Sequence, residues 1–187
     1  GSVADKTVRA PDTIRLGLFR YYNKDQPQVH YPGNLNPVHR THLLDSYIRT
    51  FNFALLDGRR VTPTSRSVRN SAGSSIIQAK IGTMRCAGEI RSIFIHEQTG
   101  IPESRQTVLA AVEWMKTSPF TPLENPKFIW DDYPELGIET WEIDRYQDRQ
   151  DGAFPIVLPL GEIHCQLARG RIEHTDPKMW ITATMDR

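Results

Sequence analysis

The sequence predicts a mainly β fold, a bent antiparallel barrel with an N-terminal extension that contains a short helix. The first observation is the spacing of apolar runs after residue 74, which are short and separated by turn signals such as Ile81-Gly82-Thr83 and Asp151-Gly152. Strands at this spacing are typical of an antiparallel barrel or a strongly bent sheet. The second observation is a hairpin signal, Asp57-Gly58, between two β-prone runs. The chain has 187 residues, which is enough to bury a core of its own.

The N-terminal extension is expected to span residues 1–50. Residues 1 to about 35 are rich in Pro, Asn, Gln and Tyr, and only residues 13–22 have an extended, β-prone character. We expect this part to wrap the domain. Asn36-Pro37 is an N-cap residue followed by proline, which predicts the start of a helix. The buried stripe of that helix would contain Val38, Leu44, Tyr47 and Ile48.

The β domain is expected to span residues 51–187. Phe51, Phe53 and Leu55 alternate as a half-buried strand, and Asp57-Gly58 then predicts a two-residue hairpin turn. Residues 59–62 return as the partner strand. Later strands are expected at residues 74–80, 87–94, 109–115 and 156–167.

Three of these later runs carry a family resemblance. They are Ala87-Gly88-Glu89-Ile90-Arg91-Ser92-Ile93-Phe94, Leu109-Ala110-Ala111-Val112-Glu113-Trp114-Met115 and Ile156-Val157-Leu158-Pro159-Leu160-Gly161-Glu162-Ile163-His164-Cys165-Gln166-Leu167. In order and spacing they resemble strands of a bromo-adjacent homology (BAH) domain. The resemblance implies a nuclear module that binds chromatin or a histone tail peptide and catalyses nothing, with DNA as an alternative ligand.

A second resemblance involves residues 53–60, 72–75, 163–170 and 180–187. These segments look like the tail region of large proteins encoded by fungal DNA transposons, and the similarity runs from about residue 51 onward. Gly1-Ser2 resembles a cloning scar and no initiator methionine follows, so we expect a fragment of a larger, transposase-like protein. The rest of that parent protein would be a further partner.

The composition favours a reduced, intracellular protein outside the membrane. The two cysteines, Cys86 and Cys165, are far apart and lack any partner spacing. No apolar run is long enough to cross a bilayer, and no signal peptide is recognisable. The net charge of +1 is unevenly distributed, because residues 58–91 hold seven basic residues and one acidic residue, whereas residues 124–151 hold nine acidic and three basic residues. The basic segment favours nucleic acid and the acidic one a basic peptide, unless the two neutralise each other on the folded surface.

The sequence contains no recognisable catalytic, metal or cofactor motif. His96-Glu97 begins a zinc-protease pattern, but Gly100 stands where the second histidine would be. His164-Cys165 is a poor base and nucleophile pair, because adjacent side chains on a strand point to opposite faces. Asp131-Asp132 and Glu135 could imitate a nuclease carboxylate cluster, yet a single loop supplies them all. We therefore predict no enzyme activity, no metal and no cofactor.

The first binding hypothesis is a histone-tail reader. A methylated lysine keeps its charge and favours a cage of aromatic faces with a carboxylate nearby. The BAH resemblance implies that Trp114 forms one wall, although Lys116 stands where such cages often have an aromatic residue. The alternative is that Trp114 and Trp141 are core residues, which we favour for Trp141 and leave open for Trp114. The candidate ligand-binding residues are Trp114, Trp130, Tyr133, Trp141, Asp131 and Asp132.

The second hypothesis is nucleic-acid binding by Arg59, Arg60, Arg66 and Arg69. Threonine, serine and asparagine side chains interleave with these arginines between residues 59 and 70, and the mixture suits contacts to phosphate. The same composition is found in ordinary solvated loops, and the near-neutral total charge argues against a dedicated DNA-binding protein. A third class is a structural interaction domain that packs against the parent protein and has no ligand of its own.

Overall fold

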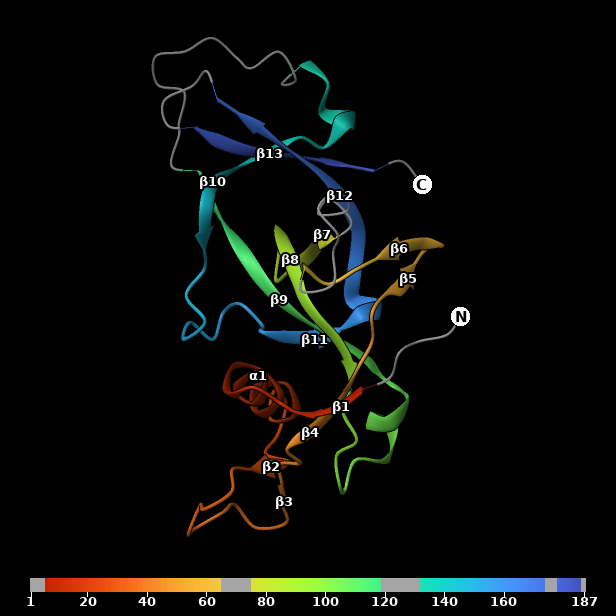
Figure 1. The fold of residues 1–187 in the computed structure, drawn as a ribbon. Coiled ribbons are helices and arrows are strands. Elements are labelled where there is room, and N and C mark those ends of the chain that lie inside the picture. Colours follow the sequence, from red (N-terminus) through yellow and green to blue (C-terminus); the bar gives the residue numbers. More distant parts are fainter. Residues whose placement is uncertain (1–5, 65–74, 119–131, 174–177, 186–187) are drawn as a thin grey trace.

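A computed structural model describes residues 6–64, 75–118, 132–173 and 178–185 (Figure 1). Its centre is a closed six-strand antiparallel barrel, which confirms the predicted fold class. Around the barrel the strands follow the order β8, β7, β12, β13, β10, β9, and β9 closes the ring by pairing with β8. The barrel strands are β7 (Ile76–Ile81), β8 (Met84–Ile95), β9 (Val108–Thr117), β10 (Glu139–Tyr146), β12 (Ile163–Ile172) and β13 (Met179–Thr184).

The first three barrel strands match the strands expected from the sequence. β7 and β8 are joined by a tight turn in which Gly82 has a φ of +61°, a left-handed conformation that glycine adopts without steric cost. β8 is long enough to pair with β7 along its first half and with β4 (Tyr47–Thr50) at its end. β9 pairs with β8 along most of its length, with one irregularity between Ile90 and Ser92.

The run predicted as one strand over residues 156–167 is divided in two. β11 (Val157–Pro159) pairs with β9, and the 3-10 turn η6 (Leu160–Glu162) redirects the chain before β12 pairs with β7. Pro159 ends the first strand, because proline has no N–H to donate to a ladder. The sequence therefore predicted β-structure in this run correctly, but it did not predict the turn that divides the run into two strands.

The first fifty residues join the same architecture. β1 (Lys6–Arg9) pairs with β4, and β4 pairs with the end of β8 through Arg49 and Thr50. β2 (Val29–His30) and β3 (His42–Leu43) form a small parallel pair. β1 and β4 therefore extend the barrel sheet, while β2 and β3 lie at the end of the molecule that Figure 1 draws lowest.

The helix of the extension lies elsewhere than predicted. Residues 13–22, which we expected to be extended, belong to helix α1 (Asp12–Tyr22), whereas no helix begins at Asn36-Pro37. Ile14, Leu18 and Tyr22 recur every four residues and are buried on one side of α1. By contrast, residues 32–40 are exposed and offer no stripe that a partner could cover. Of the residues assigned to the predicted stripe, Leu44 and Ile48 are buried outside any helix.

Close packing holds α1 against β11. A Cβ added at Gly17 would lie 2.6 Å from Val157 Cγ2, so the absence of a side chain allows the helix to approach the strand. Buried residues around this contact, including Leu18, Phe94 and Leu109, form one apolar cluster. A second cluster surrounds Trp114 and a third surrounds Trp141. No described helix is long and apolar enough to cross a membrane.

Candidate functional site

Trp114 lies in the core. It is 2% exposed, and its indole N–H donates a hydrogen bond of 2.7 Å to the Pro155 carbonyl oxygen. Across the ladder it faces Gly88, where an added Cβ would come within 2.9 Å of the Trp114 ring. In this conformation the ring packs over glycine backbone and is closed to a ligand cation.

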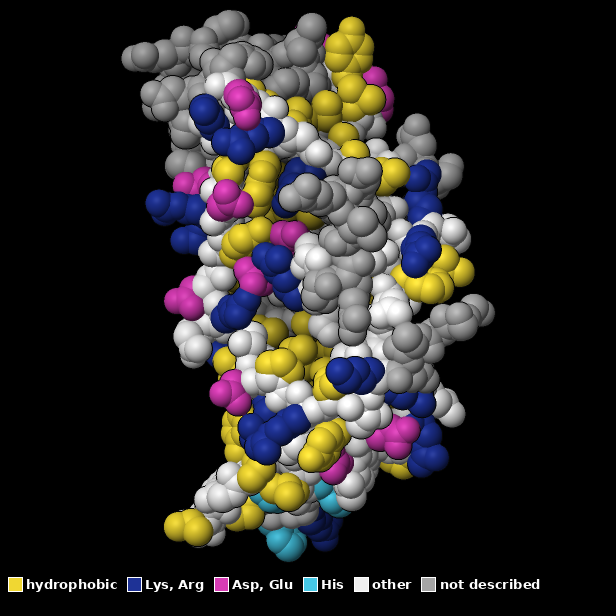
Figure 2. All heavy atoms as spheres, in the orientation of Figure 1, with side chains coloured by type: hydrophobic (Ala, Val, Ile, Leu, Met, Phe, Trp, Pro, Cys, Tyr) yellow, Lys and Arg dark blue, Asp and Glu magenta, His cyan; other side chains and the backbone are white. Residues whose placement is uncertain are grey.

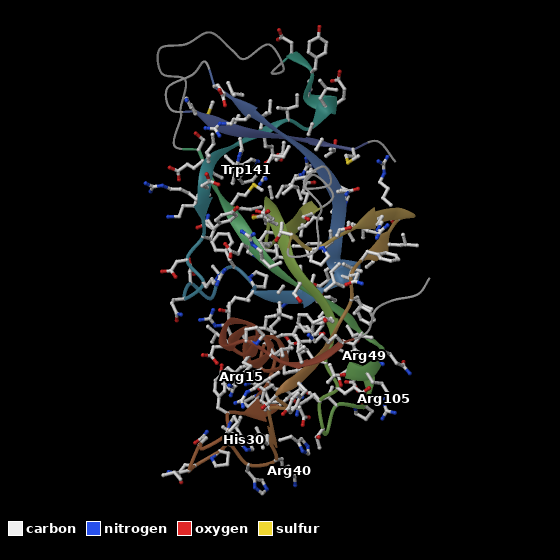
Figure 3. The ribbon with its side chains drawn as sticks, in the orientation of Figure 1. Arg15, His30, Arg40, Arg49, Arg105 and Trp141 are labelled. Carbon is white, nitrogen blue, oxygen red and sulfur yellow. The ribbon has the colours of Figure 1, made fainter. Side chains whose placement is uncertain are left out.

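Trp141 is also a buried residue, consistent with the interpretation favoured from the sequence. It is 2% exposed, and its indole N–H donates to Thr182 Oγ1 at 2.8 Å. It pairs with Trp180 across β10 and β13, and Figure 3 labels Trp141 near these strands. Trp114 and Trp141 belong to different apolar clusters, so the fold does not bring these two rings together.

The remaining predicted cage residues lie at or beyond the edge of the described structure. Tyr133 is 52% exposed and Asp132 is exposed, just before the 3-10 turn η5 (Pro134–Leu136). Trp130 and Asp131 fall outside the described residues. This acidic and aromatic segment therefore presents Tyr133 to solvent without Trp114 beside it.

The predicted hairpin is present and projects from the barrel (Figure 1). β5 (Ala54–Leu56) and β6 (Arg59–Val61) pair with each other, and both turn residues, Asp57 and Gly58, have positive φ angles of 49° and 78°. Two such residues form the turn whose twist suits a two-residue hairpin. Arg59 and Arg60 are thus placed on the returning strand, while Arg66 and Arg69 lie outside the described residues.

A groove of about 710 Å³ opens between this hairpin and the barrel. The hairpin, the β7–β8 turn and the start of β12 form its walls. The lining residues are Leu55, Leu56, Asp57, Gln78, Ala79, Lys80, Arg85, Leu160, Gly161, Glu162, Ile163 and His164. In Figure 2, basic and apolar side chains lie together where Figure 1 draws the hairpin.

Two lining residues place like charges side by side. Lys80 and Arg85 are direct partners in the β7–β8 register, and both are exposed. Like charges directly opposite each other on a sheet are destabilising. The sequence contained the signal, since the two residues flank the Ile81-Gly82-Thr83 turn, but we did not assign them to a site.

His164 lies at an irregularity in the β12–β7 ladder. Ile163 pairs with Ala79 and Cys165 with Gln78, so His164 is the extra residue of a bulge. Bulges re-aim side chains and are frequent beside functional sites. His164 is exposed and lines the groove, whereas Cys165 is buried.

Other arginines are neutralised by a partly buried network. Glu89 Oε2 accepts a hydrogen bond of 2.7 Å from the Tyr146 hydroxyl and lies 3.5 Å from Arg91 Nη2 and 3.7 Å from Arg169 Nη1. Burial, together with this bond to Glu89, raises the pKa of Tyr146 to about 12. A second carboxylate, Glu113, pairs with Arg91 and Arg149.

The basic residues around the groove lack such carboxylate partners among the described residues. Arg59, Arg60, Lys80 and Arg85 form no ion pair with any carboxylate in the described ranges. Burial raises the pKa of Glu139, and the charge of Arg85 opposes that shift without pairing. The Arg60 guanidinium stacks 4.2 Å from the centre of the Phe53 ring, which keeps the positive charge oriented at the surface.

In the part of the chain that the structure describes, no three His, Cys, Asp or Glu side chains are grouped to hold a metal ion. No family model, curated protein or solved structure matches the chain. The BAH and transposon resemblances accordingly stay predictions.

Proposed function

We propose that this chain is a non-catalytic, chromatin-binding module of a larger nuclear protein, and that the groove beside the β5–β6 hairpin binds nucleic-acid phosphate. The observation that supports the proposal is that some basic residues form ion pairs with carboxylates and others do not. Arg91, Arg149 and Arg169 are paired with carboxylates, whereas the groove and its hairpin carry basic side chains without such partners among the described residues. Unpaired guanidinium and ammonium groups beside a groove attract phosphate.

The Lys80 and Arg85 pair adds a physical reason. Two cations held in register repel each other, and a phosphate oxygen between them would convert that repulsion into two charge-assisted contacts. Asp57 and Glu162 also line the groove. They limit its net charge, which suits a moderate affinity in a protein whose formal net charge is +1.

Binding of a fluorescent DNA duplex at several salt concentrations tests this proposal. Lys80→Ala with Arg85→Ala should weaken binding and lower the slope of log K against log salt by about 1 for each phosphate interaction removed. Arg40→Ala with Arg105→Ala removes the same charge at the end of the molecule that carries β2 and β3 (Figure 3) and is the matched control. Equal affinities and slopes for the two double variants would refute a phosphate site in the groove.

A second candidate is a basic peptide such as a histone tail, bound at the acidic segment around η5. The observation that favours it is the exposure of Tyr133 between Asp132 and Glu135, which are exposed as well. An open aromatic face beside carboxylates attracts a methylated ammonium group. Peptide-array binding that Tyr133→Ala abolishes and Tyr133→Phe preserves would support this site, and unchanged binding by Tyr133→Ala would exclude it.

A further inference from the structure

We infer that the nucleic acid bound at the groove is duplex DNA, and that the β5–β6 hairpin enters its major groove. This inference rests on the proposed function and adds the class of nucleic acid and the manner of its recognition. It is carried by the geometry of the hairpin, by the residues on its outer face and by the position of the groove alongside it.

The hairpin is a two-stranded ribbon that does not belong to the barrel sheet. Within the described residues β5 and β6 pair only with each other, and the ribbon stands out to one side of the barrel in Figure 1. Its root is fixed, because Val61 is fully buried and Gln166 Nε2 donates a hydrogen bond of 3.4 Å to the Arg60 carbonyl oxygen. The major groove of B-form DNA is wide enough to admit a two-stranded ribbon.

The two faces of the ribbon have different surroundings. Ala54, Leu56 and Val61 belong to the apolar cluster around Trp114, so this face packs on the barrel. The opposite face carries Leu55 and Arg60, which are direct cross-strand partners, and Leu55 also reaches the wall of the groove. Leu55 is 63% exposed.

This pair suits the edges of base pairs. A guanidinium donates two hydrogen bonds to guanine O6 and N7, and an apolar side chain contacts the thymine methyl group, both in the major groove. The stacking of Arg60 on Phe53 limits the conformations of the guanidinium before binding.

The groove lies where a phosphate backbone would then run. The ribbon forms one of its walls, and Lys80 and Arg85 face it from the β7–β8 turn. When a ribbon occupies the major groove, the flanking sugar-phosphate strands pass along its sides. We therefore assign base edges to Leu55 and Arg60, and the adjoining phosphates to Lys80 and Arg85.

The probes are short mixed-sequence duplexes that differ in the major groove. They are B-form DNA, the same DNA with 7-deazaguanine in place of guanine, and the corresponding duplex RNA, whose major groove is too deep and narrow to be read. The chain should bind the DNA on the order of tenfold more tightly than the RNA, and removal of guanine N7 should weaken binding. Arg60→Ala should bind the two DNA duplexes equally, because the side chain that reads N7 is gone.

Lys80→Ala with Arg85→Ala should instead weaken binding to both DNA duplexes by the same factor while keeping the preference for guanine N7. Equal binding of DNA, 7-deazaguanine DNA and RNA, with Lys80 and Arg85 still required, would overturn the ribbon inference and leave the phosphate site standing. No binding of any duplex at low salt would overturn the proposed function itself. Because Leu55 and Arg60 are exposed, unfolding temperatures of their variants should match that of the parent.

Discussion

Lys80 and Arg85 face each other across the β7–β8 ladder, as two exposed cations in direct register on the wall of an open groove. Such a pair reduces the stability of the free protein and raises its attraction for an anion. Stability and anion binding therefore place opposite demands on this pair.

Replacing Lys80 with Glu should stabilise the free protein by about 0.5 kcal/mol, because the cross-strand repulsion with Arg85 becomes an attraction while Arg85 keeps its favourable charge near Glu139. The same change should weaken nucleic-acid binding. Urea unfolding at low salt measures the free energy of unfolding, and repetition at high salt should reduce the gain through screening. Arg145→Glu, an exposed replacement on β10, serves as the control for charge alone. A less stable Lys80→Glu protein would show that the pair is not repulsive.

Trp114→Ala should destabilise the domain by roughly 3–5 kcal/mol, since it removes a buried aromatic ring and leaves the Pro155 carbonyl oxygen without its donor. Thermal unfolding and methylated-peptide binding should be measured on one preparation. A folded, equally stable Trp114→Ala protein that no longer bound peptide would instead support the cage-wall interpretation.

Gly88→Ala should cost about 1–3 kcal/mol, because the new methyl group would overlap Val112 and lie 2.9 Å from the Trp114 ring. Gly152→Ala is the matched control, since an added Cβ there meets no atom within 4 Å. Denaturant unfolding compares the two variants. Equal stabilities would mean that Trp114 moves away from β8 easily.

Tyr146 should make stability sensitive to alkaline pH. Its pKa is raised from 10.0 to about 12 in the folded chain, so its contribution is present below pH 10 and is lost as pH rises toward 12. Tyr146→Phe should flatten the stability profile in this window, as measured by urea unfolding at several pH values. Tyr133→Phe, at an exposed position, should leave the profile unchanged. If the free energy of unfolding fell equally with pH in Tyr146→Phe and in the parent, the bond between Tyr146 and Glu89 would not be the cause of the decline.

Elements that depend on neighbouring residues in the chain could be predicted from the sequence alone. The alternation of β7, β8 and β9 and the Asp57-Gly58 turn depend on residues close together in the chain, and each was predicted at the right place.

Features that depend on residues far apart in the chain could be identified only in the tertiary structure. Residues 12–22 form a helix whose buried side chains, Ile14, Leu18 and Tyr22, join an apolar cluster that includes Val157 of β11, more than a hundred residues away. Exposure cannot be read from one residue either, since Trp114 is closed by Gly88 and by the Pro155 carbonyl. The groove arises in the same way, because its walls come from the hairpin, the β7–β8 turn and β12. The pairing of β12 with β7 and the packing of the hairpin on the barrel bring these segments together.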